Sequence, residues 1–537
     1  MLPPDPFAAL RRETDADRAA GAAFILETRR PEPTATVARV ARDRLGAGCA
    51  VEPLFPGPDP TFFLARLPGV RFSDIPESPY DWAYAVRDRD DFFRSVEPDT
   101  TFYFRRAPRA EGPESAEGMC FLPDDDGRTL PVNWSLEAIG APAAWALPLP
   151  EGGAAMGAGV RVAHLDTGRA VHQALPDEAF DHEGEYDFIE DTDSAVDPLE
   201  YTWSSGLYPE HPGHGTATGS AIAGRGDGAA MVRGAAPRAR LVSHRCARSV
   251  IISTTAATVA RAIVHAADAG CHVISMSLGG LPRRALREAV GYAVSNDLIV
   301  CAAAGNCVRY VVAPAIYDDC VAVAGVNREG RPWFGSCSGS EVDVSAPGEF
   351  VWVATRKPDD TRPDDSHLSA MRPGQGTSFA VANVAGAAAC WLAYHGRDRL
   401  LARYAGTRSL QHVFMELLRA TAVAHRGPDW DEANFGPGIL NVRDLLAAPL
   451  PAPGGPETIS VRRDRTYAEL LDRLGAPVPI GLEAVGGVEP YGAELIDLLY
   501  RSGPRRALVG PESVAPDDLA ETARVLGSAK LRRAAGV

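Results

Sequence analysis

The chain has 537 residues, which is enough for a large hydrophobic core and two or three domains. Its formal net charge of −16 argues against non-specific binding to nucleic acid or to anionic membranes. No stretch approaches the ~20 uninterrupted apolar residues that a membrane span needs, so we expect neither a nucleic-acid nor a membrane partner.

The amino terminus carries no apolar leader. It begins Met-Leu-Pro-Pro-Asp-Pro, and residues 1–20 are polar, which predicts a short tail. The nine cysteines are an odd number, and Cys301, Cys320 and Cys390 lie inside apolar segments, so buried thiols are favoured over a disulfide framework. Cys301 and Cys307 flank the loop of Asn306 and could in principle pair, but free thiols are the favoured interpretation. These features predict a cytoplasmic protein.

The segment 21–104 alternates short apolar runs with helical patterns. The expected elements are, in chain order, strand 22–28, helix 34–45, strand 49–54, strand 61–67, helix 80–89 and strand 92–96. This β-α-β-β-α-β order predicts a ferredoxin-like α+β domain. Residues 105–132 have many breakers and no hydrophobic period, which predicts a linker.

Between residues 133 and 447 apolar strands alternate with helical segments. This pattern predicts an α/β domain whose mostly parallel sheet is flanked by helices. Three short sequences stand out in it: His-Leu-Asp-Thr-Gly at 164–168, Gly-His-Gly-Thr at 213–216 and Gly-Thr-Ser-Phe-Ala at 376–380.

The three sequences contain an acid, a base and a nucleophile. We expect Asp166 at the end of a buried strand, and His214 and Ser378 at the starts of buried helices. A serine hydroxyl needs a neighbouring base to take its proton, and histidine has a suitable pKa. A carboxylate can hold the imidazole in the correct tautomer. A fourth sequence, Ala-Gly-Asn at 304–306, follows the apolar strand 298–303, and the amide of Asn306 could donate to a developing oxyanion.

In this order the sequences resemble the subtilisin-like serine proteases, the subtilase family, over about residues 140–445. Other motifs fit the resemblance: Pro314-Ala315 resembles the turn behind the specificity pocket, and residues 435–441 resemble the closing motif. The chain departs from the family at Ala382, where a proline is usual, so the helix after Ser378 should be less kinked.

The resemblance implies a substrate-binding set. Its members are the pairing strand, the pocket wall and a residue near the pocket floor: Ser277, Leu278 and Gly279; Ala303, Ala304 and Gly305; and Val312. It also implies that residues 21–104, which end in a Val-Glu-Pro-Asp motif at 96–99, act as a propeptide, an intramolecular chaperone and inhibitor.

The predicted function is that of a serine endopeptidase that hydrolyses peptide bonds in protein or peptide substrates. Asp166, His214 and Ser378 would form the triad, Asn306 would assist the oxyanion hole, and no cofactor would be required for the chemistry. Two alternatives stay open. One is a catalytically silent peptide-binding protein with the subtilase fold, and the other is a narrow processing protease for one partner.

Two further features have open interpretations. Acidic residues crowd the segment before His214 and suit either a structural Ca²⁺ or a solvated loop: Asp187, Glu190, Asp191, Asp193, Asp197 and Glu200. After a Pro/Gly linker at 448–456, residues 457–537 form a small appendage with helices expected at 467–474, 491–500 and 516–526. It is either a docking module for a regulatory partner or a stabilising cap.

Overall fold

The computed structural model describes most of the chain. The described part is residues 22–535 without 58–59, 71, 73–77, 100–128, 201–210, 253–255, 308–309, 357–365, 424–429, 455–466, 474–486, 503–523 and 525–526. The expected tail 1–20, most of the linker 105–132 and nearly all of the expected helix 516–526 lie outside it.

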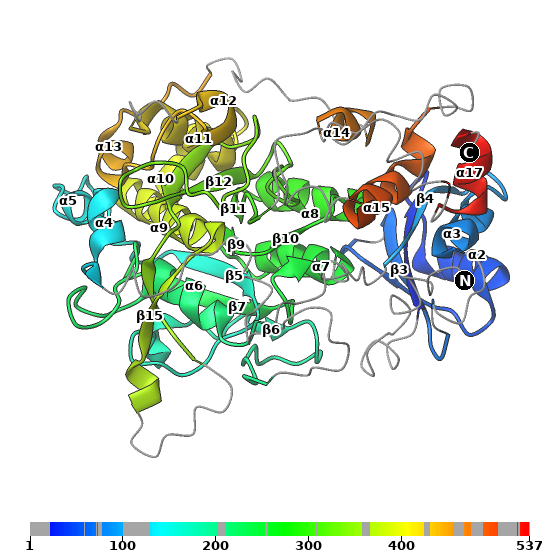
Figure 1. Ribbon diagram of the computed structural model, residues 1–537, viewed down its shortest axis with the longest axis horizontal. Helices are drawn as coiled ribbons and strands as arrows, with labels where there is room; N and C mark the ends of the chain where they lie inside the picture. Colours follow the sequence, from blue (N-terminus) through cyan, green and yellow to red (C-terminus); the bar gives the residue numbers. More distant parts are fainter. Residues whose placement is uncertain are drawn as a thin grey trace, which may run out of the picture.

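Residues 22–99, the N-terminal module, form a four-stranded antiparallel sheet covered by two helices (Figure 1). Its elements are β1 (Ala22–Thr28), α2 (Thr34–Leu45), β2 (Ala50–Pro53), β3 (Phe62–Leu67), α3 (Pro79–Arg87) and β4 (Phe93–Pro98). The strand order β2-β3-β1-β4 agrees with the ferredoxin-like arrangement that the sequence predicts. Apolar residues of one sheet face pack against the two helices in a core of their own.

Residues 129–454, the central module, are built on a seven-stranded sheet in which all pairings are parallel. In spatial order the strands are β13 (Val344–Pro347), β12 (Val321–Val326), β11 (Ile299–Ala303), β9 (Val273–Met276), β5 (Arg161–Asp166), β7 (Arg240–Arg245) and β6 (Tyr186–Asp187). The sheet and its helices confirm the predicted α/β class.

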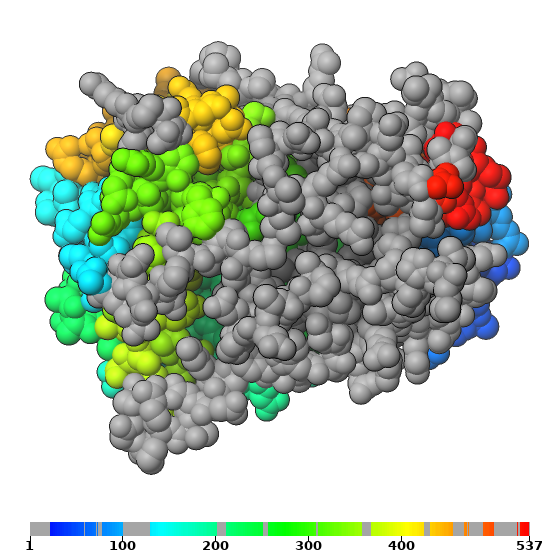
Figure 2. All heavy atoms as spheres, in the orientation of Figure 1, coloured from blue at the N-terminus to red at the C-terminus, as the bar shows by residue number. Residues whose placement is uncertain are grey.

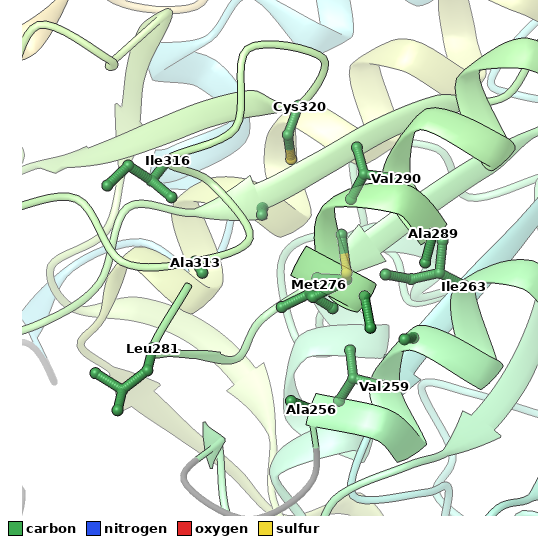
Figure 3. Packing of buried hydrophobic residues seen from close by; sticks show 14 of the residues in the cluster. Ala256, Val259, Ile263, Met276, Leu281, Ala289, Val290, Ala313, Ile316 and Cys320 are labelled. Atoms are coloured by element: carbon green, nitrogen blue, oxygen red, sulfur yellow. The ribbon is translucent and has the colours of Figure 1, made fainter. Parts of the chain in front are cut away.

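Helices cover both faces of this sheet. One face carries α7 (Ala256–Asp268) and α8 (Arg284–Ser295), and the other carries α6 (His214–Ala223) and α9 (Thr377–His395). In Figure 3, Met276 at the end of β9 lies among Val259 and Ile263 of α7 and Val290 of α8. Along β5, side chains alternate between the two faces, because successive residues of a strand point in opposite directions.

The remaining elements of the central module are short or peripheral. They are α4 (Trp134–Ala138), α5 (Ala141–Trp145), β8 (Ile251–Ile252), β10 (Gly279–Gly280), β14 (Val351–Ala354), β15 (Met371–Gly374), α10 (Arg397–Tyr404), α11 (Leu410–Thr421), α12 (Glu432–Phe435) and α13 (Val442–Ala447). Among the described residues, 3₁₀ turns of this module lie at Asp177–Ala179 and Ser366–Ser369, and a further one lies at Glu489–Tyr491 in the C-terminal segment. By length and composition α9 could cross a membrane, but 94% of its most apolar window is buried inside the protein, as expected of a core helix.

The C-terminal segment, residues 467–535, supplies α14 (Tyr467–Arg473), α15 (Gly492–Ser502) and α17 (Ala529–Ala535). Figure 1 shows α15 between α8 and the N-terminal sheet. In Figure 2 the atoms of α17, in red, adjoin those of the N-terminal module, in blue. Buried apolar side chains of both modules and of this segment belong to one continuous cluster, so the three parts share a core.

Candidate active site

Asp166 is the last residue of β5, at the carboxyl end of the central sheet, and the residue is 1% exposed. Its Oδ1 atom accepts hydrogen bonds from the backbone N–H of Thr167 at 2.7 Å and from Nδ1 of His214 at 2.8 Å. Burial alone would raise the pKa of this carboxyl, but the His214 imidazole and these hydrogen bonds hold it below its usual value. The group is therefore ionised at neutral pH.

His214 is the first residue of α6, and its position depends on the glycines on either side. Gly213 has a φ of +80°, and a Cβ atom there would lie 2.1 Å from the carbonyl oxygen of Arg356. A Cβ atom on Gly215 would lie 2.1 Å from the carbonyl oxygen of Gly168, just beyond Asp166. These close approaches require glycine and bring the start of α6 against the end of β5.

Ser378 is the second residue of α9 and is 5% exposed. Its hydroxyl donates to the carbonyl oxygen of Ser277 at 3.4 Å, and the hydroxyl of Ser277 donates to the carbonyl oxygen of Ser378 at 2.9 Å. The ring of Phe379, the next residue, lies 6.4 Å from the ring of His214, centroid to centroid. The serine and the histidine are thus on neighbouring helix starts, where the helix dipoles favour negative charge.

Asn306 follows β11 and is fixed against the start of α9. Its Oδ1 atom accepts from the backbone N–H of Thr377 at 2.9 Å and from the hydroxyl of Thr377 at 2.8 Å. A Cβ atom on Gly376 would lie 3.3 Å from Nδ2 of Asn306. Because the amide oxygen is occupied by Thr377, the amide NH₂ group is the part that faces the region beside Gly376 and Ser378.

The predicted substrate-binding residues come together beside these groups. Gly279 lies in β10, which pairs with β8, and Ala303 ends β11. The methyl groups of Val312 would lie 2.3 Å from a Cβ atom on Gly279 and 3.0 Å from one on Gly305. Val312, at 8% exposed, therefore fills the space between the two walls that the sequence predicts for a pocket.

The sequence analysis did not predict two residues that lie beside Asp166. His164 lies two residues before Asp166 in β5, and Thr218 lies four residues after His214 in α6. The Thr218 hydroxyl donates to Oδ2 of Asp166 at 3.0 Å and lies 2.9 Å from Nε2 of His164. Their spacing in the sequence could have indicated this position, because residues two apart share a face of a strand and residues four apart share a face of a helix.

Acidic side chains of the segment before His214 form ion pairs and hydrogen bonds with other groups of the chain. Asp187 pairs with Arg245 at 2.5 Å and Glu190 pairs with Arg248 at 2.6 Å, while Asp197 accepts from the Thr167 hydroxyl and from the Gly213 backbone. Among the residues that the structure describes, no group of three or more His, Cys, Asp or Glu is arranged to hold a metal ion.

The cysteines agree with the prediction only in part. Cys301, Cys320 and Cys390 are free and buried, as expected of small apolar side chains. Cys307 is disulfide-bonded, so the preference for free thiols is wrong at this position, and its partner is not Cys301, which is free.

Comparison with known proteins identifies relatives over the central module. Residues 157–433 match the model of the subtilase family. Thermitase of Thermoactinomyces vulgaris is 34% identical over 265 residues, which is 49% of this chain and 82% of thermitase. Mycosin-3 of Mycobacterium tuberculosis is 30% identical over 372 residues, which is 59% of this chain and 72% of mycosin-3.

The structure of fervidolysin from Fervidobacterium pennivorans, described as a keratinolytic enzyme related to subtilisin, shares the fold. It is 21% identical with a TM-score of 0.54, over 80% of this chain and 61% of that chain.

The relatives correct the predicted location. Mycosin-3 and mycosin-4 of Mycobacterium tuberculosis are among them. Their match with this chain contradicts the predicted cytoplasmic location. The disulfide at Cys307 agrees with this correction, because structural disulfides persist in oxidising compartments.

The family match covers more than half of the chain, and the sheet and its helices agree with it. The chain belongs to the subtilase family of serine proteases.

Proposed function

We propose that the protein is a serine endopeptidase whose triad is Asp166, His214 and Ser378, with Asn306 as an oxyanion donor. The observation that carries the proposal is the 2.8 Å hydrogen bond between Nδ1 of His214 and Oδ1 of Asp166, made beside the helix start that carries Ser378. Protein or peptide chains are the substrates of this family, and its chemistry needs no cofactor.

The mechanism is acyl transfer followed by hydrolysis. Oγ of Ser378 attacks the scissile carbonyl carbon while Nε2 of His214 takes the hydroxyl proton. Asp166 holds Nδ1–H and stabilises the imidazolium, and the amide of Asn306 donates to the carbonyl oxygen as it becomes negative. His214 then protonates the leaving amine, and a water molecule releases the acyl group by the same steps in reverse.

Labelling with a fluorophosphonate probe tests this function, because only an activated serine displaces the fluoride. We expect labelling of the wild-type protein and of a Ser295→Ala control, in which an exposed serine of α8 is removed. We expect none after Ser378→Ala. An unlabelled wild-type protein that still binds peptides would support the silent binding protein instead.

The side chain of Val312 supports a pocket that accepts small or medium apolar residues at the first substrate position. It lies between Gly279 and Gly305, where a glycine in relatives would leave room for an aromatic ring. Overfilling a confined apolar site costs ~1–3 kcal/mol, which is roughly 10- to 200-fold in specificity. We therefore expect poor cleavage after Phe, Tyr and Trp.

A peptide-library profile measures this preference. Val312→Gly should raise kcat/KM for Phe substrates by about 10- to 100-fold relative to Ala substrates. Val311→Ala is the matched control, because the neighbouring valine points toward the site of Gly339 instead of the pocket. A dominant Phe or Arg signal in the wild-type profile would show that Val312 does not limit the pocket.

For the other modules we propose an inhibitory N-terminal module that the C-terminal segment holds in place. Asp497 of α15 accepts from Tyr80 of α3 and, at 2.9 Å, from Arg283 at the start of α8. Glu27 of β1 pairs with Arg284 at 2.7 Å. Because buried pairs are costly to break, these contacts favour retention of the N-terminal module after a cut in the linker. They support the stabilising cap over a docking module for a regulatory partner.

Incubation of the purified chain tests this arrangement. We expect a cut between about residues 100 and 133, identified by sequencing the new amino terminus, and co-elution of both fragments on size exclusion. Asp497→Ala should release the N-terminal fragment and raise activity. Asp43→Ala is the control, since this exposed acid pairs with Arg89 inside the module. An uncut chain with full activity would indicate a permanent accessory domain instead of an inhibitor.

A further inference from the structure

We propose that His164 is a positioning residue, which acts through the hydroxyl of Thr218 to fix the second carboxylate oxygen of Asp166. The inference rests on the proposed triad and extends it by one imidazole and one hydroxyl. It concerns atoms that touch neither substrate nor the reacting serine.

The geometry places three groups in a row. Nε2 of His164 lies 2.9 Å from Oγ1 of Thr218, and Oγ1 of Thr218 lies 3.0 Å from Oδ2 of Asp166. His164 is 2% exposed and Thr218 is fully buried, so water does not compete readily for these bonds. Since Thr167 and His214 bind the other oxygen, Oδ1, the row completes the hydrogen bonding of the carboxylate.

The donor-to-acceptor direction of these hydrogen bonds follows from the tautomer of His164. Burial lowers the pKa of His164, and the nearby Asp166 only partly offsets this, so the ring is neutral and carries one N–H. Nε2 lies 3.7 Å from Oδ2 of Asp166, and a lone pair there would face a carboxylate. The proton is therefore favoured on Nε2, from which it is donated to Thr218.

This donation decides where the Thr218 proton goes. A hydroxyl has one proton to donate, and Oγ1 of Thr218 also lies 3.1 Å from the carbonyl oxygen of His214, the usual acceptor for a threonine within a helix. With a lone pair of Oγ1 occupied by His164, the carboxylate of Asp166 is the strongest remaining acceptor. Hydrogen bonds in a row polarise and strengthen one another.

The ring of His164 packs directly against α6. His164 and Asp166 lie on the same face of β5, toward α6, and a Cβ atom on Gly219 would lie 3.5 Å from Cε1 of His164, an ordinary van der Waals distance. The imidazole therefore fits against this turn of α6 without a close approach. On the next strand, Ser243 lies opposite His164 in register, and its buried hydroxyl has no hydrogen-bond partner among the described residues.

The consequence concerns the orientation of Asp166. If His164 no longer donates, Thr218 can turn its proton to the His214 carbonyl, and Oδ2 is left buried without its donor. The carboxylate is then held at one oxygen only, and the imidazole that it orients is less well placed for proton transfer. Substrate binding does not use these atoms, so kcat should fall while KM stays nearly constant.

Four variants and a control test the inference in the full chain. His164→Leu and Thr218→Val should each lower kcat by about tenfold, with KM within about twofold. His164→Gln, whose Nε2 lies as many bonds from Cβ as that of histidine, should keep kcat within about threefold. The double variant His164→Leu/Thr218→Val should be no worse than Thr218→Val. Ser243→Ala, the matched control in the next strand, should behave as wild type.

A spectroscopic readout separates positioning from packing. The downfield proton resonance of His214 Nδ1–H should move in His164→Leu and Thr218→Val and stay in place in His164→Gln and Ser243→Ala. A double variant with about a hundredfold loss, the product of the single losses, would overturn the inference, as would a His164→Gln variant that is as defective as His164→Leu.

The remaining outcomes are also decisive. If His164→Leu does not fold, a kcat kept in His164→Gln and lowered about tenfold in Thr218→Val still supports the inference. An unchanged kcat in Thr218→Val overturns it. Failure of the triad itself is distinguishable, because Ser378→Ala would then be active, whereas failure of this inference alone leaves Ser378→Ala inactive.

Discussion

Replacement of Ser378 by alanine is expected to lower kcat by about 10⁶-fold, the size of the effect known for subtilisin, a member of this family. The substitution removes the only atom that could form the acyl-enzyme, while His214 and Asp166 keep their 2.8 Å hydrogen bond. Turnover of casein or of a peptide ester measures the loss. The residual rate comes from binding and from the oxyanion donors alone.

The fold should survive this change. Ser378 is buried at the start of α9, where the loss of one hydroxyl leaves little space, and alanine is a good helix former. The melting temperature should therefore stay close to that of the wild type. Ser295→Ala is the matched control, because Ser295 is an exposed serine of α8 outside the site, and the activity should remain that of the wild type. Near-wild-type turnover by Ser378→Ala would contradict the assignment.

The main elements were predictable because short-range patterns determine them. The six elements expected for the N-terminal module agree with the observed ones to within about two residues at each end, since alternation and helical spacing are local properties. The placement of Asp166, His214 and Ser378 at the ends of regular elements was predictable for another reason. Each lies where an element begins or ends with a glycine within two residues, and this leaves a short motif in the sequence.

The features that could not be predicted depend on contacts between parts of the chain that are distant in sequence. Nothing near Asp497 indicates that it meets Tyr80 and Arg283, because such pairs exist only after the modules pack. The composition of the acidic segment was compatible with a calcium site, but Asp187 and Glu190 pair with arginines from the strand β7 and from just beyond it. The cytoplasmic location predicted from the first residues was wrong, because the composition of a chain's first residues is weak evidence of location and the match with the mycosins contradicts it.

Replacement of Asn306 is expected to lower kcat by roughly 10²–10³-fold with little change in KM, the effect known for such a donor in subtilisin. The amide strengthens its hydrogen bond only when the carbonyl oxygen becomes negative, so its loss affects the transition state and not substrate binding. Asn306→Ala has a second effect, however. It also removes the acceptor for the backbone and hydroxyl of Thr377 at the start of α9.

Two further variants separate the donor from the acceptor. Asn306→Asp keeps an oxygen for Thr377 but replaces the NH₂ donor by a charged oxygen, so kcat should fall at least as far as in Asn306→Ala. Thr377→Val removes the hydroxyl bonded to Oδ1 and leaves the donor, so its loss should stay below about tenfold. Steady-state kinetics on one peptide substrate compares all three. If Thr377→Val loses as much as Asn306→Asp, the asparagine acts by anchoring the helix, and the oxyanion is stabilised by other groups.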